Sequence, residues 1–240
     1  MKGVILAGGT GSRLFPLTKV TNKHLLPIGS KPMIFHPIEK LISARITDIL
    51  IVTGVDHMGD VVNLLGSGKD FQCRFTYKVQ DAAGGIAQAL GLGEDFAHGE
   101  KICVILGDNI FQDSLGPIVE NFKKQSKGAK LLIKEVSDPH RFGVAEIKGK
   151  RIIGIEEKPK HPKSSYCVTG IYMYDEEVFA MIPKLSPSKR GELEITDVNN
   201  SYIRQSTLTY DILKGWWTDA GTFPSYRLAN ELVEAQEAAP

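Results

Sequence analysis

The sequence predicts an α/β fold, a mostly parallel mixed sheet flanked by helices in the Rossmann-like manner. Short runs rich in Val, Ile and Leu recur along the chain, and they alternate with longer amphipathic segments. Strands this apolar are typical of a sheet that is covered on both faces. The 240 residues are enough for one sizeable α/β domain. We therefore expect a single domain over residues 1–240, with halves at about 1–135 and 136–240.

Strands and helices are expected to alternate through the first half. Residues 3–7 are the first apolar run and predict a buried strand, and residues 32–45 follow as a helix with Ile34, Ile38 and Leu41 on one face. The later expected elements are a strand at 48–53, a helix at 85–96, a strand at 101–106, a helix at 115–125 and a strand at 129–135.

The second half is less regular. Its expected strands cover residues 142–147, 152–156 and 168–174, with a hairpin tip at Gly149 and Lys150 and a helix from about residue 224 onward. The sequence has no internal repeat and no low-complexity segment.

Composition excludes several classes of function. Lys plus Arg (29) nearly balances Asp plus Glu (28), so no global field attracts nucleic acid or an anionic membrane. The three cysteines Cys73, Cys103 and Cys167 have no CxxC spacing, which predicts reduced core thiols and neither disulfides nor a zinc site. The apolar run 4–7 is too short for a signal-peptide core, and no run reaches membrane-spanning length. A cytoplasmic enzyme is expected.

Ligands of such sheets bind beyond the carboxyl ends of the strands. That rule selects the segments Gly8–Arg13 and Gly107–Asn109, which directly follow expected strands. In the first segment, glycine N–H groups can converge on an anion, and an arginine adds charge. The segment is not a Walker A loop, because Ser12 and Arg13 follow Gly11, and Leu14 replaces the third glycine of a dinucleotide loop. Alone, it fits a plain turn as well as an anion site.

The continuation of this loop is more specific. Residues 8–34 read GGTGSRLFPLTKVTNKHLLPIGSKPMI, which resembles the signature of the sugar-phosphate nucleotidyltransferases, and most closely that of members that transfer a thymidylyl group. Further landmarks of that family follow in order at residues 79–80, 84–89, 106–109, 141–144, 156–159, 168–170, 190–197 and 217–222. The resemblance therefore covers nearly the whole chain.

The resemblance implies that the phosphate of a sugar 1-phosphate attacks the α-phosphorus of a nucleoside triphosphate and that pyrophosphate leaves. It implies dTTP, or UTP, and glucose 1-phosphate as substrates, with residues 1–135 binding the nucleotide. Arg13, Lys23 and Lys158 are the implied catalytic residues, since two anions must be brought together. The implied nucleotide-binding set is Leu6, Gly8, Gly9, Gly11, Ser12, Arg13, Lys23, Gln80, Gly85 and Asp108.

The same resemblance places the sugar phosphate in residues 136–240 and a metal between the halves. The implied sugar-phosphate set is Asn109, Gly143, Glu157, Lys158, Val168 and Thr169. Asp108 and Asp219 would share one Mg²⁺, which commonly takes one or two carboxylates and keeps water or phosphate ligands. Spacing alone favours a helix cap for Asp108 and a turn for Asp219. Residues 190–197 are expected to be mainly structural.

Two features depart from the common family pattern. Phe142 stands where many relatives have Tyr, so one hydroxyl contact to the sugar is missing. The chain also resembles the short form, without the extra C-terminal helices that help to form a regulatory nucleotide site and subunit contacts in longer relatives. We expect a homo-oligomer.

Alternative functions remain open. One is a UTP-using or dual-specificity enzyme, because thymine and uracil differ by one methyl. The other is a non-catalytic sugar-nucleotide sensor, against which the presence of all the cationic and acidic positions argues.

Overall fold

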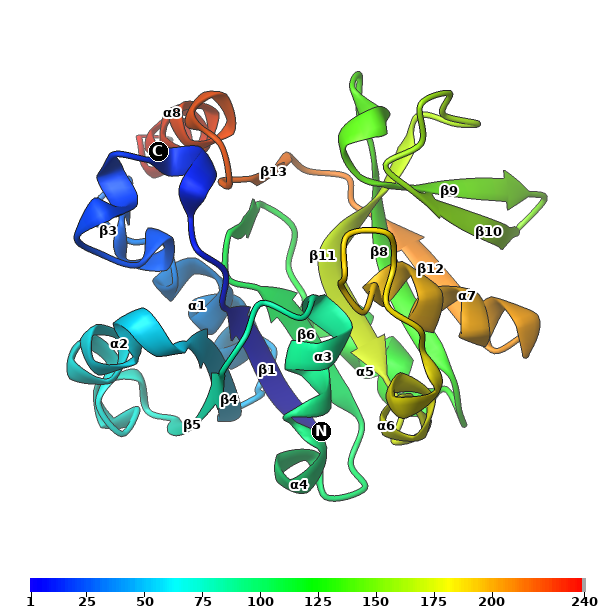
Figure 1. Ribbon diagram of the computed structural model, residues 1–240, viewed down its shortest axis with the longest axis horizontal. Helices are drawn as coiled ribbons and strands as arrows, with labels where there is room; N and C mark the ends of the chain where they lie inside the picture. The colour runs from blue at the N-terminus through cyan, green and yellow to red at the C-terminus, as the bar shows by residue number, and fades with distance from the viewer. Residues whose placement is uncertain (239–240) are drawn as a thin grey trace.

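A computed structural model describes residues 1–238 (Figure 1). Its centre is a nine-stranded sheet in the order β10-β9-β11-β6-β1-β4-β5, with β8 paired to β11 and β12 paired to β8. The strands are β1 (Lys2–Ala7), β4 (Asp48–Gly54), β5 (Arg74–Gln80), β6 (Ile102–Leu106), β8 (Ala129–Glu135), β9 (Gly143–Lys148), β10 (Arg151–Glu157), β11 (Tyr166–Tyr174) and β12 (Leu208–Ile212).

Strand direction divides the sheet into two parts. β6, β1, β4 and β5 are mutually parallel, as their apolar runs predict. β11 then runs antiparallel to β6, β8 and β9, and β10 is antiparallel to β9. The predicted mixed sheet is confirmed. The parallel strands place their carboxyl ends at one edge, where the glycine-rich loop and the segment after β6 begin.

Alternate residues of each central strand bury on opposite faces. Val4 and Leu6 of β1 belong to one apolar cluster, and Ile5 and Ala7 belong to another. The first cluster is covered by α3 (Ile86–Gly91), α4 (Glu94–Ala97), α6 (Glu177–Met181) and α7 (Ile195–Arg204). The second is covered by α1 (Phe35–Ser43), α2 (Met58–Leu65) and α5 (Gly116–Lys124). Helices on both faces explain why the strands are apolar throughout.

Several predicted boundaries were wrong. The helix expected at 32–45 begins only at Phe35, because Lys31 and Pro32 form β3 (Lys31–Pro32), which pairs with β2 (Pro27–Ile28). The helix expected at 85–96 is two short helices, α3 and α4, with Gly93 as the residue that precedes α4. The strand β5 and the helices α2, α6 and α7 were not predicted.

A third small layer joins the two ends of the chain. The ribbon of β7 (Asn109–Phe111) and β13 (Trp217–Asp219) leads into α8 (Phe223–Glu237), which Thr222 and Ser225 start with a capping box. Ala229 and Val233 of α8 pack in one apolar cluster with Ile28 and Met33. Figure 1 shows α8 beside the N-terminal loops and opposite the β9–β10 hairpin.

Among residues 1–238, none of the helices has the length and apolar character needed to cross a membrane. The three cysteines are buried free thiols, as predicted.

Candidate active site

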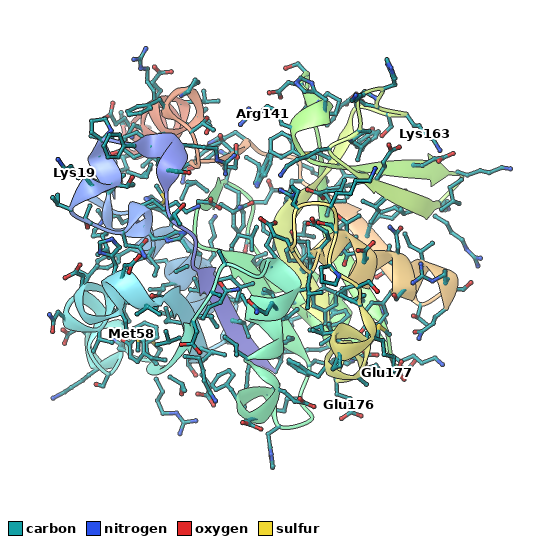
Figure 2. All side chains as sticks on the ribbon, in the orientation of Figure 1. Lys19, Met58, Arg141, Lys163, Glu176 and Glu177 are labelled. Carbon is teal, nitrogen blue, oxygen red and sulfur yellow. The ribbon has the colours of Figure 1, made fainter. Side chains whose placement is uncertain are left out.

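One cavity of about 370 Å³ lies beyond the carboxyl ends of the parallel strands. One side is formed by the loop after β1 and by residues after β5 and β6, and the other by β9, β10 and β11. Figure 2 shows Arg141, one of the lining residues, between α8 and the β9–β10 hairpin. The predicted residues that line it are Leu6, Gly8, Gly9, Arg13, Lys23, Gln80, Gly85, Asp108, Asn109, Gly143, Glu157, Lys158, Val168 and Asp219.

The glycine-rich loop begins where β1 ends. Gly9 (φ 94°) and Gly11 (φ 63°) have left-handed backbones, which glycine adopts without strain. Gly8 and Gly9 line the cavity. Gly11 and Ser12 do not, because the loop turns away into a short 3₁₀ helix, and the Thr18 hydroxyl donates to the carbonyl of Gly11 at 2.9 Å. Their assignment to direct ligand contact is therefore not supported by the geometry.

Three charged side chains converge on the space beside Gly221. A Cβ atom built on this glycine would lie 3.3 Å from Arg13 Nη2, 3.3 Å from Asp108 Oδ2 and 3.6 Å from Asp219 Oδ2. These residues are far apart in sequence. They meet because β13 pairs with β7, which places Asp219 opposite Asn109. The absence of a side chain at Gly221 leaves their charged atoms room for a shared ligand.

Lys23 provides a second cation to this space. It opens a short 3₁₀ helix, Lys23–Leu25, capped by the Asn22 side chain, and its Nζ forms an ion pair with Asp108 Oδ2. Burial on its own would raise the pKa of Asp108, but the opposing interactions, led by the charge of Lys23 and including the hydrogen bond from Asn109, together hold the pKa of this carboxyl well below its ordinary value. Asp108 is therefore an anion.

The pKa of Asp219 is shifted in the opposite direction to that of Asp108. Burial and then the neighbouring Asp108 carboxylate raise its pKa to about 6, although Arg141 and Arg13 oppose them. Arg141 Nη2 donates to Asp219 Oδ1 at 3.2 Å. Two close carboxylates that repel each other favour a bound cation.

This donor set fits a metal that substrate completes. Among the described residues, no group of three or more His, Cys, Asp or Glu side chains could hold an ion by itself. Asp108 and Asp219 instead offer two hard oxygen donors beside the open space at Gly221. Mg²⁺ is bound in this way, through one or two carboxylates together with substrate phosphates and water.

His24 also lines the cavity and was not predicted. Its ring is 1% exposed, and Nδ1 lies 2.7 Å from Asn22 Oδ1, an acceptor that requires a proton on Nδ1. Burial, followed by the charge of Lys23, lowers its pKa to about 3. His24 is thus a neutral imidazole, so the cations at this site are lysine and arginine.

Gln80 and Gly85 lie at one end of the cavity. Gln80 ends β5 and is 9% exposed. Its Nε2 donates to Gln88 Oε1 at 2.8 Å and to the Gly85 carbonyl at 3.2 Å. Both hydrogens of this amide are thus used within the protein. The carbonyl oxygen, Oε1, is left for a ligand.

Glu157 and Lys158 line the cavity at the end of β10. Gly143 pairs with Glu157 across the β9–β10 hairpin, and the Thr196 hydroxyl donates to Glu157 Oε2 at 2.7 Å. Lys158 follows with a left-handed backbone (φ 44°), and its amide donates to the carbonyl of Phe142 at 3.0 Å. This hairpin directs a carboxylate and an ammonium group to the same end of the cavity.

Two residues of the implied sugar-phosphate set, Thr169 and Asn109, use their side chains for hydrogen bonds within the protein. Thr169 is fully buried, and its hydroxyl donates to the carbonyl of Leu132 at 2.7 Å, so its side chain does not face the cavity. Asn109 is 2% exposed, and its Oδ1 accepts from Gly170 N at 2.8 Å and Trp217 Nε1 at 2.8 Å. Its Nδ2 donates to Asp108 Oδ1 at 3.1 Å. Asn109 therefore holds Asp108 and two strands in place.

Several lining residues were missed by the sequence reasoning. The segment 190–197 was expected to be structural, yet Arg190 lines the cavity, with Nη2 2.8 Å from Glu194 Oε2 and 3.7 Å from Glu157 Oε1. Trp217 also lines the cavity and was not singled out; it packs edge-on against Phe142, with 5.3 Å between ring centroids. The signal for all of them was their membership of family landmarks, which did not say which way each side chain points.

Comparisons with known sequences agree on one family. The family model of nucleotidyl transferases matches residues 2–236. The glucose-1-phosphate thymidylyltransferase of Neisseria meningitidis serogroup A is 42% identical over 238 residues, which cover 98% of this chain and 83% of the relative.

Solved structures share the fold closely. A proposed glucose-1-phosphate thymidylyltransferase of Bacillus anthracis, in complex with sucrose, superposes with a TM-score of 0.94 and 63% identity over 97% of this chain and 94% of that one. UDP-glucose pyrophosphorylase complexed with UDP-glucose gives a TM-score of 0.88 at 25% identity, covering 98% of each chain.

Proposed function

The chain belongs to the nucleotidyl transferase family, and we propose that it forms dTDP-glucose and pyrophosphate from dTTP and glucose 1-phosphate. The observation that carries the proposal is the convergence of Arg13, Asp108 and Asp219 beside Gly221, in one cavity with Lys23 and Lys158. Cations and a carboxylate pair in this arrangement suit two phosphate-bearing substrates.

The chemistry needs positioning and charge neutralisation more than proton transfer. An oxygen of the sugar phosphate forms a bond to the α-phosphorus, while the bond from that phosphorus to the bridging oxygen breaks and pyrophosphate departs. The attacking oxygen is already ionised, so no general base is required. Both reactants are anions, and cations that offset their repulsion lower the barrier.

Each cation has a place in this scheme. Lys23 lies against Asp108, next to the shared space, and neutralises charge near the α-phosphate. Arg13, whose guanidinium reaches the space beside Gly221, binds the departing pyrophosphate, a role that its planar set of donors suits. Lys158 binds the sugar phosphate at the other end of the cavity. Mg²⁺, held by Asp108 and Asp219, would supply further positive charge to phosphate oxygens.

The relatives support the choice of substrates. The thymidylyltransferases that this chain resembles at 42% identity and more support dTTP and glucose 1-phosphate. UTP is the second candidate, because the UDP-glucose pyrophosphorylase structure shares the fold and a single methyl distinguishes the bases by only about 1–3 kcal/mol. A non-catalytic sensor is disfavoured, since Arg13, Lys23, Lys158 and both aspartates line the cavity.

Location and assembly are part of the proposal. Three buried free thiols suit a reducing compartment such as the cytoplasm. Exposed large apolar side chains, among them Phe15 (60%) and Val20 (81%), support a homo-oligomer, whose mass light scattering would measure.

Pyrophosphate release tests the activity directly. We expect release with dTTP and glucose 1-phosphate in the presence of Mg²⁺, and its loss when EDTA is added. Crossing dTTP, UTP and CTP with several hexose 1-phosphates ranks the substrates. Release that never exceeds the enzyme-free rate with any pair would refute the proposal.

A further inference from the structure

Gln88 lies outside the cavity but is bonded to Gln80. It sits in the first turn of α3, with its side chain partly exposed. Its Oε1 accepts from two donors, Gln80 Nε2 at 2.8 Å and the Gly84 amide at 3.1 Å. The amide is packed tightly, because a Cβ atom on Gly84 would collide with it.

The direction of these bonds is fixed by the backbone. The Gly84 amide can only donate, and it is shared between the Ala82 carbonyl at 2.8 Å and Gln88 at 3.1 Å, so the atom of Gln88 that faces it is the oxygen. That oxygen can only accept from Gln80, so Gln80 must turn its NH₂ group toward Gln88. The chemical identity of one backbone atom thus sets the orientation of two side-chain amides.

The remaining atoms of Gln80 then face the ligand. Its second amide hydrogen points at the Gly85 carbonyl, 3.2 Å away, and that carbonyl already accepts from Ala89 N at 3.2 Å. Gln80 Oε1 lies next to Gly8, where a Cβ atom would come within 3.0 Å of it. The oxygen therefore borders the glycine-rich loop and the cavity.

Gly85 supplies the complementary group. It has a left-handed backbone (φ 98°), and a Cβ atom there would lie 2.5 Å from the Leu193 carbonyl, so only glycine fits. Among the described residues, no group accepts from its N–H. The cavity thus presents an acceptor at Gln80 and a donor at Gly85.

We propose that Gln88 is a positioning residue that selects the nucleotide base by fixing the amide of Gln80. This inference rests on the proposed function. Thymine and uracil both carry an imide N–H flanked by carbonyls, which matches an acceptor beside a donor. In the same seating, cytosine presents a bare ring nitrogen to Gln80 Oε1, and two acceptors then face each other.

Two substitutions separate orientation from packing. Gln88→Met keeps the length of the side chain but removes the acceptor, so the Gln80 amide can rotate. Gln88→Glu keeps an acceptor for both the Gly84 amide and Gln80 Nε2, and restores the orientation. Affinities for dTTP and CTP, measured by titration calorimetry with Mg²⁺, report the preference without turnover.

We expect the dTTP-to-CTP affinity ratio to fall about 10-fold in Gln88→Met, as for one lost hydrogen bond, and to stay within about 3-fold of the wild type in Gln88→Glu. In a Gln80→Ala background, Gln88→Met should have no further effect on the ratio, because the two residues act as one unit.

The results that would contradict the role of Gln88 differ from those that would contradict the proposed activity. An unchanged ratio in Gln88→Met, an equal fall in Gln88→Glu, or an added fall in the Gln80→Ala background would overturn the role of Gln88. If the wild type discriminates the bases but releases no pyrophosphate, the proposed activity fails and this inference stands.

Discussion

Lys158 is held against the cavity by backbone constraints. Its left-handed φ of 44° and the bond from its amide to Phe142 turn the chain at the end of β10, so the ammonium group follows directly on Glu157. In the sequence, Lys158 differs little from Lys160, two residues later. After the hairpin, Lys158 lines the cavity and Lys160 does not.

Lys158→Met should raise the KM for glucose 1-phosphate about 10- to 100-fold, since a charged hydrogen bond to phosphate is lost. The KM for dTTP should change less than about 3-fold. Steady-state pyrophosphate release with each substrate varied in turn measures both. Lys160→Met, at an exposed lysine outside the cavity, is the matched control. Equal losses for the two substrates would contradict the assignment of Lys158 to the sugar phosphate.

His24 connects the site to stability. Its ordinary pKa of 6.5 falls to about 3 in the folded protein, so the unfolded chain binds more protons below pH 6.5. The stability contribution of the neutral ring is complete above pH 6.5 and decreases as pH falls toward 3. At pH 5, the cost should be about 2 kcal/mol relative to pH 8.

His24→Gln removes this titration, and the new amide can still donate to Asn22. We expect the free energy of unfolding, measured with urea at pH 8 and pH 5, to drop about 2 kcal/mol less in the variant than in the wild type. Other groups titrate in both proteins and cancel in the difference. The same drop in the two proteins would show that His24 is not a buried neutral ring.

At the scale of elements, Asn109 joins three strands. It begins β7, and its Oδ1 accepts from Gly170 of β11 and Trp217 of β13. The ribbon β7–β13 carries both Asp108 and Asp219 at its end. This one amide therefore sets the distance between the carboxylate pair and the antiparallel half of the sheet.

Asn109→Leu should destabilise the protein by about 2–5 kcal/mol, because two buried donors lose their acceptor at once. Urea unfolding measures the loss. Asn63→Leu, on the exposed face of α2, makes the same chemical change without a buried partner and should stay within about 0.5 kcal/mol of the wild type. Similar values for both variants would rule out the bridging role.

The sequence predicts the elements that depend on local pattern. The apolar run 3–7 is β1, and the helix expected from 224 is α8, both within a residue or two. The same reasoning fails where distant contacts decide. Leu193 N donates to the Gly84 carbonyl, and Ala87 N to the Leu193 carbonyl. These bonds link the α3 turn to residues 190–197, the segment expected to be mainly structural.

The family motifs identified residues of the site, but they did not indicate the direction in which each side chain points. Arg13, Lys23, Asp108 and Asp219 come together as the family pattern implies. Thr169 also belongs to a family landmark. However, β11 shifts register between Val168 and Tyr172, and the Thr169 hydroxyl donates to the Leu132 carbonyl. A side chain's direction depends on strand pairing that one sequence does not display.

At the scale of the whole molecule, the cavity collects residues from nearly the full length of the chain. Gly8 lies near the N-terminus of the chain and Asp219 near the C-terminus, and both line the cavity. The β7–β13 ribbon and α8 connect these two segments through the apolar cluster that contains Ile28 and Val233. A ligand that touches these segments together binds only the folded chain. Its affinity must therefore add to the stability of the whole fold.

We expect dTTP with Mg²⁺ to raise the midpoint of thermal unfolding by about 5–10 °C at 100 times the dissociation constant, which corresponds to about 2.7 kcal/mol. Mg²⁺ alone should shift it by less than about 2 °C, because two carboxylates without phosphate oxygens complete too little of its coordination. EDTA should reverse the combined shift. Differential scanning fluorimetry measures all three, with Asp219→Asn as the variant in which the cooperation disappears. If dTTP were to give the same shift with and without Mg²⁺ in the wild type, metal and nucleotide would bind independently, and the carboxylate pair would not be their meeting point.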